Sequence, residues 1–372
     1  MKIIEVEALY IRLPSVRKLC DSGQDALIIK VHTDAGITGL GEVDSIPLAA
    51  KGAIESPFSH SAACGLREII LGEDPFETEK IWQKMYRANI YGGRRGVGFH
   101  AMSGIDLALW DIKGKALKLP VWKLLGGGFQ KRLRCYASSL FGNTPKETGE
   151  RARRYRDAGF TAVKFGWDPM GKDEKTDIAL VREGRKGCGD EMDLLIDAGL
   201  CWDSKTAIRR ARAFEEYNIF WLEEPLLPDD YEGYRRLCEA SPIRIAAGEE
   251  ESNRQSFLDL MDRGKIDVVQ IDLTRCGGFT EAVKIASLAQ DRGLLVANHG
   301  FTTYINVAAA LHFLASIPNA LIVEFVAEEE TKLRDQITKQ KIRAEDGYLQ
   351  VPEEPGLGIE LDEEAVARFR VN

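Results

Sequence analysis

Three acidic residues recur at equal intervals in the middle of this 372-residue chain. Asp197, Glu223 and Glu249 are 26 residues apart (197 to 223 and 223 to 249), and each closes an apolar run. One strand, one helix and their connections fit this interval, so the acids occupy equivalent positions in successive βα units. Because carboxylates crowded into one cavity repel one another, they need a cation between them, and all-oxygen ligands favour Mg²⁺, or Mn²⁺ as a substitute. The spacing therefore predicts a Mg²⁺ site.

The alternative for each acid is a loop residue or a helix N-cap that faces solvent. That alternative suits a single acid better than three acids in register. Glu224 and Glu250 adjoin two of the predicted ligands, and the alternation of side chains along a strand points them to the opposite face. They are therefore second choices as metal ligands.

A histidine and an aspartate close the next two predicted strands. Of the five histidines in the chain, His299 alone closes a strand of the repeating units, and Asp272 closes the strand before it. A carboxylate bonded to one ring nitrogen fixes the tautomer and raises the basicity of the other nitrogen. The alternative is a core histidine bonded to a backbone carbonyl. The Asp partner and the acids at the same rim favour a general base at His299.

Two further charged residues belong to the same set of strands. Lys164 lies on the second strand, where its ammonium could contact the substrate or a developing oxyanion. A snorkelling or salt-bridged lysine is an equal alternative. Glu324 closes the eighth strand and could donate a hydrogen bond to an enolate oxygen if burial keeps it protonated. Its alternative is an acid at the start of a helix.

These residues belong to a repeating pattern of elements. Short apolar runs alternate with polar helical stretches, which predicts βαβ units and a parallel sheet. Eight such units in roughly two hundred residues fit a closed barrel better than an open sheet. The runs are Leu133–Ala137, Thr161–Phe165, Met192–Asp197, Ile219–Glu223, Ile243–Glu249, Val268–Asp272, Leu294–His299 and Leu321–Phe325.

The ends of the chain follow a different pattern. Ile3–Arg12 and Ala26–His32 alternate as strands do, and a helical pattern follows them. We predict the α/β class with an α+β capping domain over residues 1–125 and a (β/α) barrel catalytic domain over 126–326. A C-terminal segment, 327–372, is expected to return to the capping domain.

The composition excludes several classes of protein. The net charge is −8 and the pI about 5.4, without a basic run, which argues against a nucleic-acid partner. No apolar run is long enough to cross a bilayer, and no N-terminal segment has the order of a signal peptide. The seven cysteines contain no Cys-x-x-Cys pair and indicate reduced thiols. We therefore expect a cytoplasmic protein with no membrane partner.

Several segments resemble the enolase superfamily, and specifically its mandelate racemase-like branch. Two of them resemble the end of the capping domain in that branch, two resemble its second and third metal-ligand motifs, and three resemble its Asp–His dyad region. The segments are IDLALWDIKGKA (105–116), PVWKLLGG (120–127), WLEEP (221–225), AGE (247–249), QID (270–272), GG (277–278) and NHG (298–300).

This resemblance implies an enolase-type modified TIM barrel with one Mg²⁺ per subunit. The substrate would be a small carboxylate, here a sugar acid, bound through its carboxylate to the metal and converted to an enediolate by loss of the alpha proton. Loops of the capping domain, here Leu19–Gln24 and Asp44–Ser59, would close over the pocket and select the substrate. Such proteins are commonly homo-oligomers.

Two departures from the branch bear on the reaction. Many members carry Lys-x-Lys on the second strand with the second lysine as a base, but here that position is Gly166. The third strand reads Asp197-Ala198-Gly199 and lacks the Asp-x-His base of some relatives. The face of the substrate opposite His299 therefore has no evident strong base.

A single base favours dehydration, a lyase reaction. An aldonate or aldarate would lose water to give a 2-keto-3-deoxy sugar acid. Two alternatives stay open. One is an epimerase, racemase or cycloisomerase that uses Lys164 as a second base. The other is a non-catalytic paralogue that only binds sugar acids.

Overall fold

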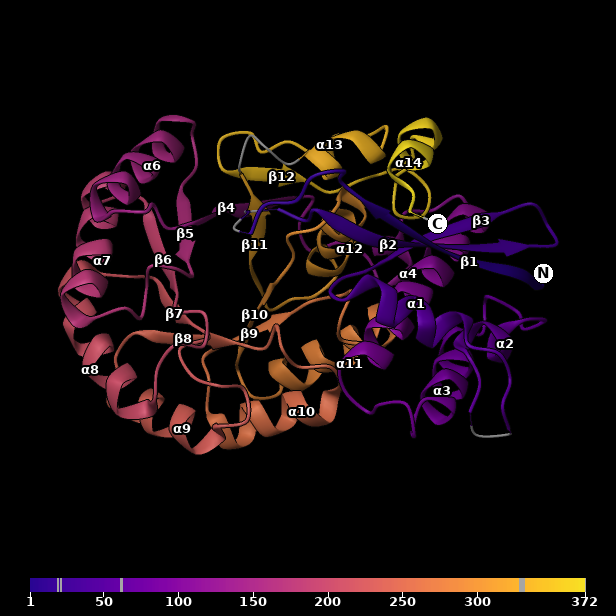
Figure 1. Cartoon of the computed structure of the whole chain (residues 1–372), viewed down its shortest axis with the longest axis horizontal. Helices are drawn as coiled ribbons and strands as arrows, with labels where there is room; N and C mark the ends of the chain where they lie inside the picture. The colour runs from indigo at the N-terminus through magenta and orange to yellow at the C-terminus, as the bar shows by residue number, and fades with distance from the viewer. Residues whose placement is uncertain (19, 21, 61–62, 328–331, 372) are drawn as a thin grey trace.

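The chain begins with an antiparallel sheet, on the right of Figure 1. The computed structural model describes residues 1–18, 20, 22–60, 63–327 and 332–371. The strands of the sheet are paired in the order β1-β2-β3, with Tyr10 opposite Leu27 and Leu27 opposite Val43. Their bounds are β1 (Ile3–Arg12), β2 (Asp25–Thr33) and β3 (Thr38–Val43).

Glycines on β3 allow a long helix to lie directly against its backbone. A Cβ at Gly41 would come within 1.9 Å of the carbonyl oxygen of Gly104, and a Cβ at Gly39 within 2.0 Å of that of Ala108. A larger residue at either position would push the helix off the sheet. The helices around this sheet are α1 (Pro47–Glu55), α2 (Leu66–Ile70), α3 (Thr78–Ala88) and α4 (Val97–Leu117), with the short α5 (Val121–Leu124) leading to the barrel.

Eight parallel strands in the described part of the chain form a closed barrel, because β11 pairs with β4. Their order in space is their order in the sequence, so successive βα units are neighbours (Figure 1). The predicted barrel and its capping domain are confirmed. The strands are β4 (Arg132–Leu140), β5 (Ala162–Gly166), β6 (Asp193–Asp197), β7 (Trp221–Glu223), β8 (Arg244–Ala247), β9 (Val268–Ile271), β10 (Leu295–Asn298) and β11 (Ala320–Val326).

Helices surround the barrel, and several begin at a capping side chain. Asp173, Asp203 and Asp230 each accept a hydrogen bond from the backbone N–H three residues later. Each cap satisfies an amide that a helix start leaves unpaired. The helices are α6 (Pro145–Asp157), α7 (Glu174–Cys188), α8 (Ser204–Phe214) with a 3₁₀ turn (Glu215–Tyr217), α9 (Tyr231–Ala240), α10 (Arg254–Asp259) with a π turn (Leu260–Gly264), α11 (Gly278–Gln290) and α12 (Tyr304–Ala315). None of the helices in the described residues is both long and apolar enough to span a membrane.

The barrel interior has an apolar layer below a polar one. Leu195 and Trp221 belong to the apolar layer, and two residues further along the same strands come Asp197 and Glu223. Side chains two residues apart on a strand face the same side, so the acids also point inward, nearer the carboxyl ends. The buried apolar layer consists of Tyr136, Ala162, Leu195, Trp221, Ala246, Val268, Ala297 and Ile322.

The C-terminal segment lies against both parts of the molecule (Figure 1). Its strand β12 (Tyr348–Gln350) pairs antiparallel with β4, and the amide of Val371 donates to the carbonyl of Tyr10 on β1 at 2.9 Å. This segment also contains α13 (Lys332–Ile337) and α14 (Glu363–Phe369). It thus extends the capping domain, while the predicted division at residues 125 and 326 stays a prediction.

One buried carboxylate joins the sheet, the long helix and the C-terminal segment. Asp111 on α4 accepts hydrogen bonds from the amides of Leu40 and Leu357, each at 2.8 Å. It also pairs with Lys115 at 2.6 Å. Its two oxygens therefore accept from β3, from the C-terminal segment and from its own helix, and so join parts of the chain that are far apart in the sequence.

We predict that Asp111→Ala lowers the free energy of unfolding by about 3 kcal/mol or more, because two buried amides and one ammonium lose their acceptor. Urea unfolding followed by circular dichroism measures this loss. Asp229→Ala is the control. Asp229 is exposed and its ion pair with Arg95 is long, at 3.6 Å, so the free energy of unfolding should change by no more than about 0.5 kcal/mol. Equal stability of the two variants would contradict this role for Asp111.

Candidate active site

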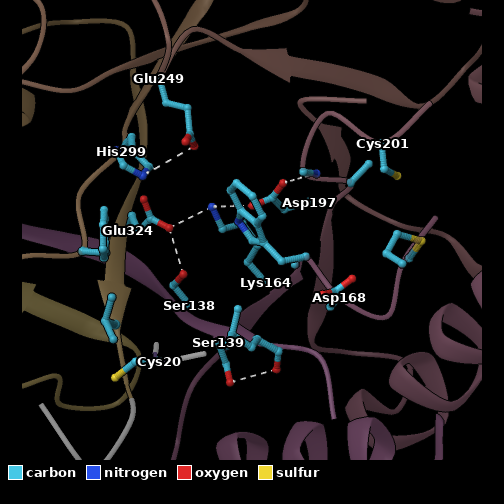
Figure 2. A pocket seen from close by; sticks show the side chains of 18 of the residues that line it. Cys20, Ser138, Ser139, Lys164, Asp168, Asp197, Cys201, Glu249, His299 and Glu324 are labelled. Atoms are coloured by element: carbon cyan, nitrogen blue, oxygen red, sulfur yellow. Dashed lines mark hydrogen bonds and ion pairs between the residues drawn. The ribbon is translucent and has the colours of Figure 1, made fainter. Parts of the chain in front are cut away.

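A pocket of about 470 Å³ opens at the carboxyl ends of the barrel strands. Its walls come from the ends of β4, β5, β6 and β11 and from the segments that follow β8, β9 and β10. Lys18 and Cys20 of the capping domain complete the rim. Figure 2 shows charged side chains from several strands pointing into a common space. This is the end of the barrel at which such folds place their chemistry.

The three predicted metal ligands come from adjacent strands. Asp197 and Glu223 are directly opposite each other in the β6–β7 pair, and Glu249 follows β8 by two residues. All three are buried. Among the described residues, two sets of side chains have ligand atoms that all lie within 4.8 Å of one another, and these three acids are not one of those sets. The structure thus brings the acids to one rim without closing them around a common point.

The ammonium of Lys164 lies between Asp197 and Glu324 in Figure 2. It donates to Glu223, lies 2.8 Å from Glu324 Oε1 and is 3.8 Å from Asp197 Oδ2. Burial alone would lower the pKa of Lys164, but the surrounding carboxylates, Glu223 first, raise it well above its usual value. Lys164 is therefore a cation that offsets the charge of the acids. Its contacts are those of a salt-bridged lysine, which was one of the two interpretations of this residue.

The acids outnumber the cations around the pocket. Five carboxylates and two permanent cations are buried there, and burial raises the pKa of both Asp197 and Glu223. A divalent cation would relieve this excess of negative charge, and the donor set consists of the oxygens that Mg²⁺ prefers. The residues present therefore fit Mg²⁺. The groups counted are Asp197, Glu223, Glu249, Asp272, Glu324, Lys164 and Arg275.

His299 and Asp272 form the predicted pair. The two side chains meet at 2.7 Å between Nδ1 and Oδ2, and the other oxygen of Asp272 accepts from the amide and hydroxyl of Thr274. Nε2 of His299 is turned to the cavity, 3.5 Å from Glu249 Oε2. Burial would lower the pKa of His299, but the charge of Glu249 and the bond to Asp272 raise it. The imidazole is therefore more basic than a free histidine side chain at the nitrogen that faces the pocket.

The contacts of Glu324 favour its charged form, not the protonated form that donation to an enolate oxygen would need. Burial would raise its pKa, but Lys164 first and His299 second lower it below its usual value. Glu324 also accepts hydrogen bonds from the hydroxyl of Ser138 and the amide of Gly300, each at 2.9 Å. These donors favour the carboxylate form, in which Glu324 orients Lys164 and the segment after β10.

Two families of known proteins match nearly the whole chain. Residues 14–126 match the N-terminal domain of mandelate racemase and muconate lactonizing enzyme, and residues 147–365 match the enolase C-terminal domain-like family. The chain belongs to the mandelate racemase-like branch of the enolase superfamily. Both of its domains, the capping domain and the barrel, are therefore those of this family.

Enzymes with different reactions are about equally similar to this enolase-superfamily chain. D-galactarolactone cycloisomerase of Agrobacterium fabrum is 32% identical over 93% of this chain and 91% of its own. D-galactonate dehydratase of Xanthomonas oryzae pv. oryzae is 34% identical over 93% of this chain and 91% of its own. A solved racemase of Streptomyces coelicolor with bound magnesium is 30% identical, with a TM-score of 0.87 over 99% of this chain and 100% of its own.

Of the remaining residues that the sequence analysis named, some line the pocket and others do not. Glu224 faces away from the pocket and binds the amide of Gly248, whereas Glu250 lines the pocket. In the Leu19–Gln24 loop, Cys20 lines the pocket, and residues 19 and 21 lie outside the described residues. No residue of Asp44–Ser59, all of which are described, lines it.

Sequence reasoning missed a buried cation that belongs to the site. Arg275 lines the pocket beside the dyad, with Nη1 at 3.6 Å from Glu249 Oε1 and Nε at 3.8 Å from Asp272 Oδ2. Its position three residues after Asp272 was a usable signal, because residues just after a barrel strand lie at the catalytic rim. Trp167 and Asp168, which follow β5, also line the pocket and were not singled out.

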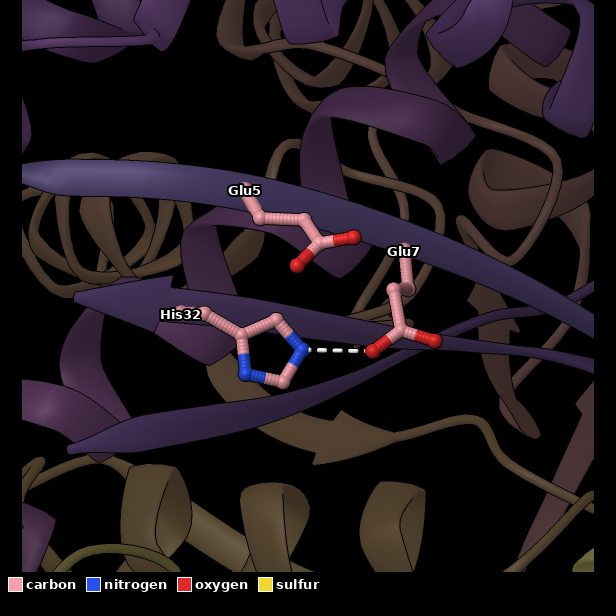
Figure 3. A group of neighbouring side chains, drawn as sticks. All are labelled: Glu5, Glu7 and His32. Carbon is pink, nitrogen blue, oxygen red and sulfur yellow. Dashed lines mark hydrogen bonds and ion pairs between the residues drawn. The ribbon is translucent and has the colours of Figure 1, made fainter. Parts of the chain in front are cut away.

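A separate cluster of ligand-type side chains lies on the capping sheet, shown in Figure 3. His32 on β2 contacts Glu7 at 2.6 Å through Nε2 and Thr38 at 2.9 Å through Nδ1, and Glu5 lies beside them. Both ring nitrogens of His32 are thus engaged by protein groups from β1 and β3. The cluster joins the three strands of the sheet and is independent of the pocket.

We predict that Lys164→Met lowers the free energy of unfolding in EDTA at pH 8 by about 3–5 kcal/mol, because buried carboxylates lose their counter-charge. Addition of Mg²⁺ should restore part of this loss. Urea unfolding with and without Mg²⁺ tests both statements. Lys339→Met is the control, since Lys339 is exposed and pairs with an exposed glutamate, Glu360, and its effect should be small and independent of Mg²⁺. A Lys164 variant as stable as the control would count against the charge balance.

Proposed function

We propose that this enzyme removes the proton alpha to the carboxylate of a sugar acid and then expels water, giving a 2-keto-3-deoxy sugar acid. One observation carries this proposal: the two sides of the pocket differ in their bases. His299 and Asp272 supply a base on one side. Lys164, the other candidate, donates its protons to carboxylates, and the position two residues after it is glycine.

Asp197, Glu223 and Glu249 would hold the Mg²⁺ ion. When bound there, Mg²⁺ stabilises the negative charge that develops on the substrate carboxylate as the proton leaves. The burial of these acids, the excess of negative charge around them and the magnesium in a related racemase support this assignment.

His299 would act first as a base and then as an acid. Its Nδ1–H donates to Asp272, and its Nε2, in the deprotonated form of the ring, takes the alpha proton. The C–H electron pair passes into the carboxylate and then forms the double bond between C2 and C3 as the C3–O bond breaks. The proton on Nε2 goes to the departing 3-hydroxyl on the same face, so water leaves by syn elimination. The resulting enol becomes the 2-keto product.

The other side of the pocket would orient the substrate. Lys164 offers an ammonium, and the hydroxyl of Ser139 lies at the same wall. Glu324 fixes Lys164 at 2.8 Å, so the cation is already in place when negative charge develops. This preorganisation stabilises the charged intermediate without any movement of the protein.

Cycloisomerisation or epimerisation is the second candidate, because a cycloisomerase is as similar to this chain as a dehydratase is. It would use Lys164 as the second base, which requires this lysine to lose a proton among three carboxylates. The contacts of Lys164 therefore favour dehydration. A protein that binds sugar acids without catalysis is the third candidate.

A panel of aldonic and aldaric acids and their lactones, incubated with Mg²⁺ in D₂O, distinguishes these functions. We predict a keto-acid product that has lost one water and carries a solvent deuterium at C3, where the enol takes up a hydron as it becomes the ketone. Deuterium at C2 without loss of water would instead establish epimerisation, and isomerisation of a lactone would establish cycloisomerisation. Binding of a sugar acid without exchange or product would leave a non-catalytic role.

We predict that His299→Asn lowers kcat by at least about 10³-fold while Mg²⁺ binding is retained, because only proton transfer is lost. Steady-state kinetics and calorimetric titration of Mg²⁺ measure the two effects. His32→Asn removes a histidine of the capping sheet and serves as the control with normal kcat. A His299 variant that keeps its activity would rule out this residue as the base.

A further inference from the structure

We propose that Asp44 of the capping domain is a positioning residue that holds Arg275 away from the catalytic carboxylates. Asp44 does not line the pocket, so it would act only through Arg275. This inference rests on the proposed function, since it concerns the groups assigned to proton transfer and metal binding.

Arg275 is a buried cation with one dominant partner. Its Nε and Nη2 lie 2.9 and 2.7 Å from Asp44 Oδ2. Its Nη1 donates to the backbone carbonyl of Glu249 at 3.2 Å. The carboxylates of Glu249 and Asp272 are further away, at 3.6 and 3.8 Å. Arg275 is therefore close enough to influence both acids, while its hydrogen bonds go elsewhere.

This separation matters because Asp272 has another task. Its Oδ2 is the oxygen that meets His299 at 2.7 Å, and it is also the oxygen nearest to Arg275. A guanidinium forms its strongest hydrogen bonds with carboxylates. Without Asp44, Arg275 would be free to pair with Asp272 or Glu249, and would then compete with His299 for the first and with Mg²⁺ for the second.

The backbone after Asp44 fixes its position. Ser45 and Ile46 both adopt left-handed conformations, with φ of 65° and 48°. This region is unfavourable for a β-branched residue such as Ile46, whose side chain is 63% exposed. Because this side chain is exposed, its packing does not explain the strained turn. Strained backbone persists only where the surrounding contacts require it. Here the turn places the carboxylate of Asp44 beside Arg275 of the barrel.

Asp44, Asp272 and His299 also form a buried set whose ligand atoms lie within 4.8 Å of one another. Such a set could hold a cation, but the guanidinium of Arg275 already contacts Asp44 in this cluster. His100, which is half-buried, lies near enough to feel the charges of both Asp44 and Arg275. The capping domain thus supplies a charge that the barrel alone lacks.

A double-mutant cycle tests the proposal. We expect Asp44→Asn to lower kcat about tenfold with little change in KM, and to weaken Mg²⁺ binding about tenfold by calorimetry. In an Arg275→Met background the same Asp44 substitution should change neither quantity, because the competing cation is gone. Asp44→Glu, which keeps the charge, should recover much of both losses.

The matched control is Asp106→Asn. Asp106 is another buried aspartate of the capping domain, and it accepts from the amide of Thr280 on α11 without contacting Arg275. Its effects should be equal in the wild-type and Arg275→Met backgrounds. Thermal unfolding of each variant shows whether it is folded, and the Asp44→Glu variant carries the test if Asp44→Asn is not.

Two results would overturn the proposal. One is an Asp44→Asn variant with wild-type kcat and Mg²⁺ affinity, and the other is an effect of the same size in both backgrounds. If the wild-type enzyme turns over no sugar acid, the proposed reaction is wrong, but the proposal for Asp44 can still be tested. The Mg²⁺ titrations then decide whether Asp44 acts through Arg275.

Discussion

The arrangement of this molecule depends on the burial of like charges at one end of the barrel. Acids from five strands or the segments just after them are buried around the pocket. In a medium that screens charge poorly, their mutual repulsion is large unless cations are placed among them. Lys164 and Arg275 provide two such cations, and each contacts more than one carboxylate. The need to offset buried negative charge therefore explains why both cations lie among carboxylates.

The two cations have different surroundings and so different effects. Lys164 lies inside the barrel and binds carboxylates of the barrel alone. Arg275 lies at the rim and is held by Asp44, from the capping domain. A barrel without its capping domain would keep the first arrangement and lose the second. The capping domain is therefore part of the electrostatic design of the site as well as one wall of the pocket.

Several features could be predicted from the sequence because they depend on local periodicity. Strand alternation and the equal spacing of Asp197, Glu223 and Glu249 predicted adjacent strands and one common rim. The same reasoning placed His299 beside Asp272, since neighbouring parallel strands bring their ends together. The reactions that relatives catalyse could not be separated in this way, because the hydroxyl groups of a substrate are read by side chains from several loops.

The sequence by itself determined the barrel, the inward direction of the acids and the pairing of the dyad, because each follows from a period of two along a strand and from the order of the strands. Only the tertiary structure decided the hydrogen-bond partners of Glu324, the partners of Lys164 and the link from Asp44 to Arg275. These depend on distances between side chains far apart in the chain, 231 residues in the last case. Electrostatic energy follows such distances in space, and no local pattern in a sequence records them.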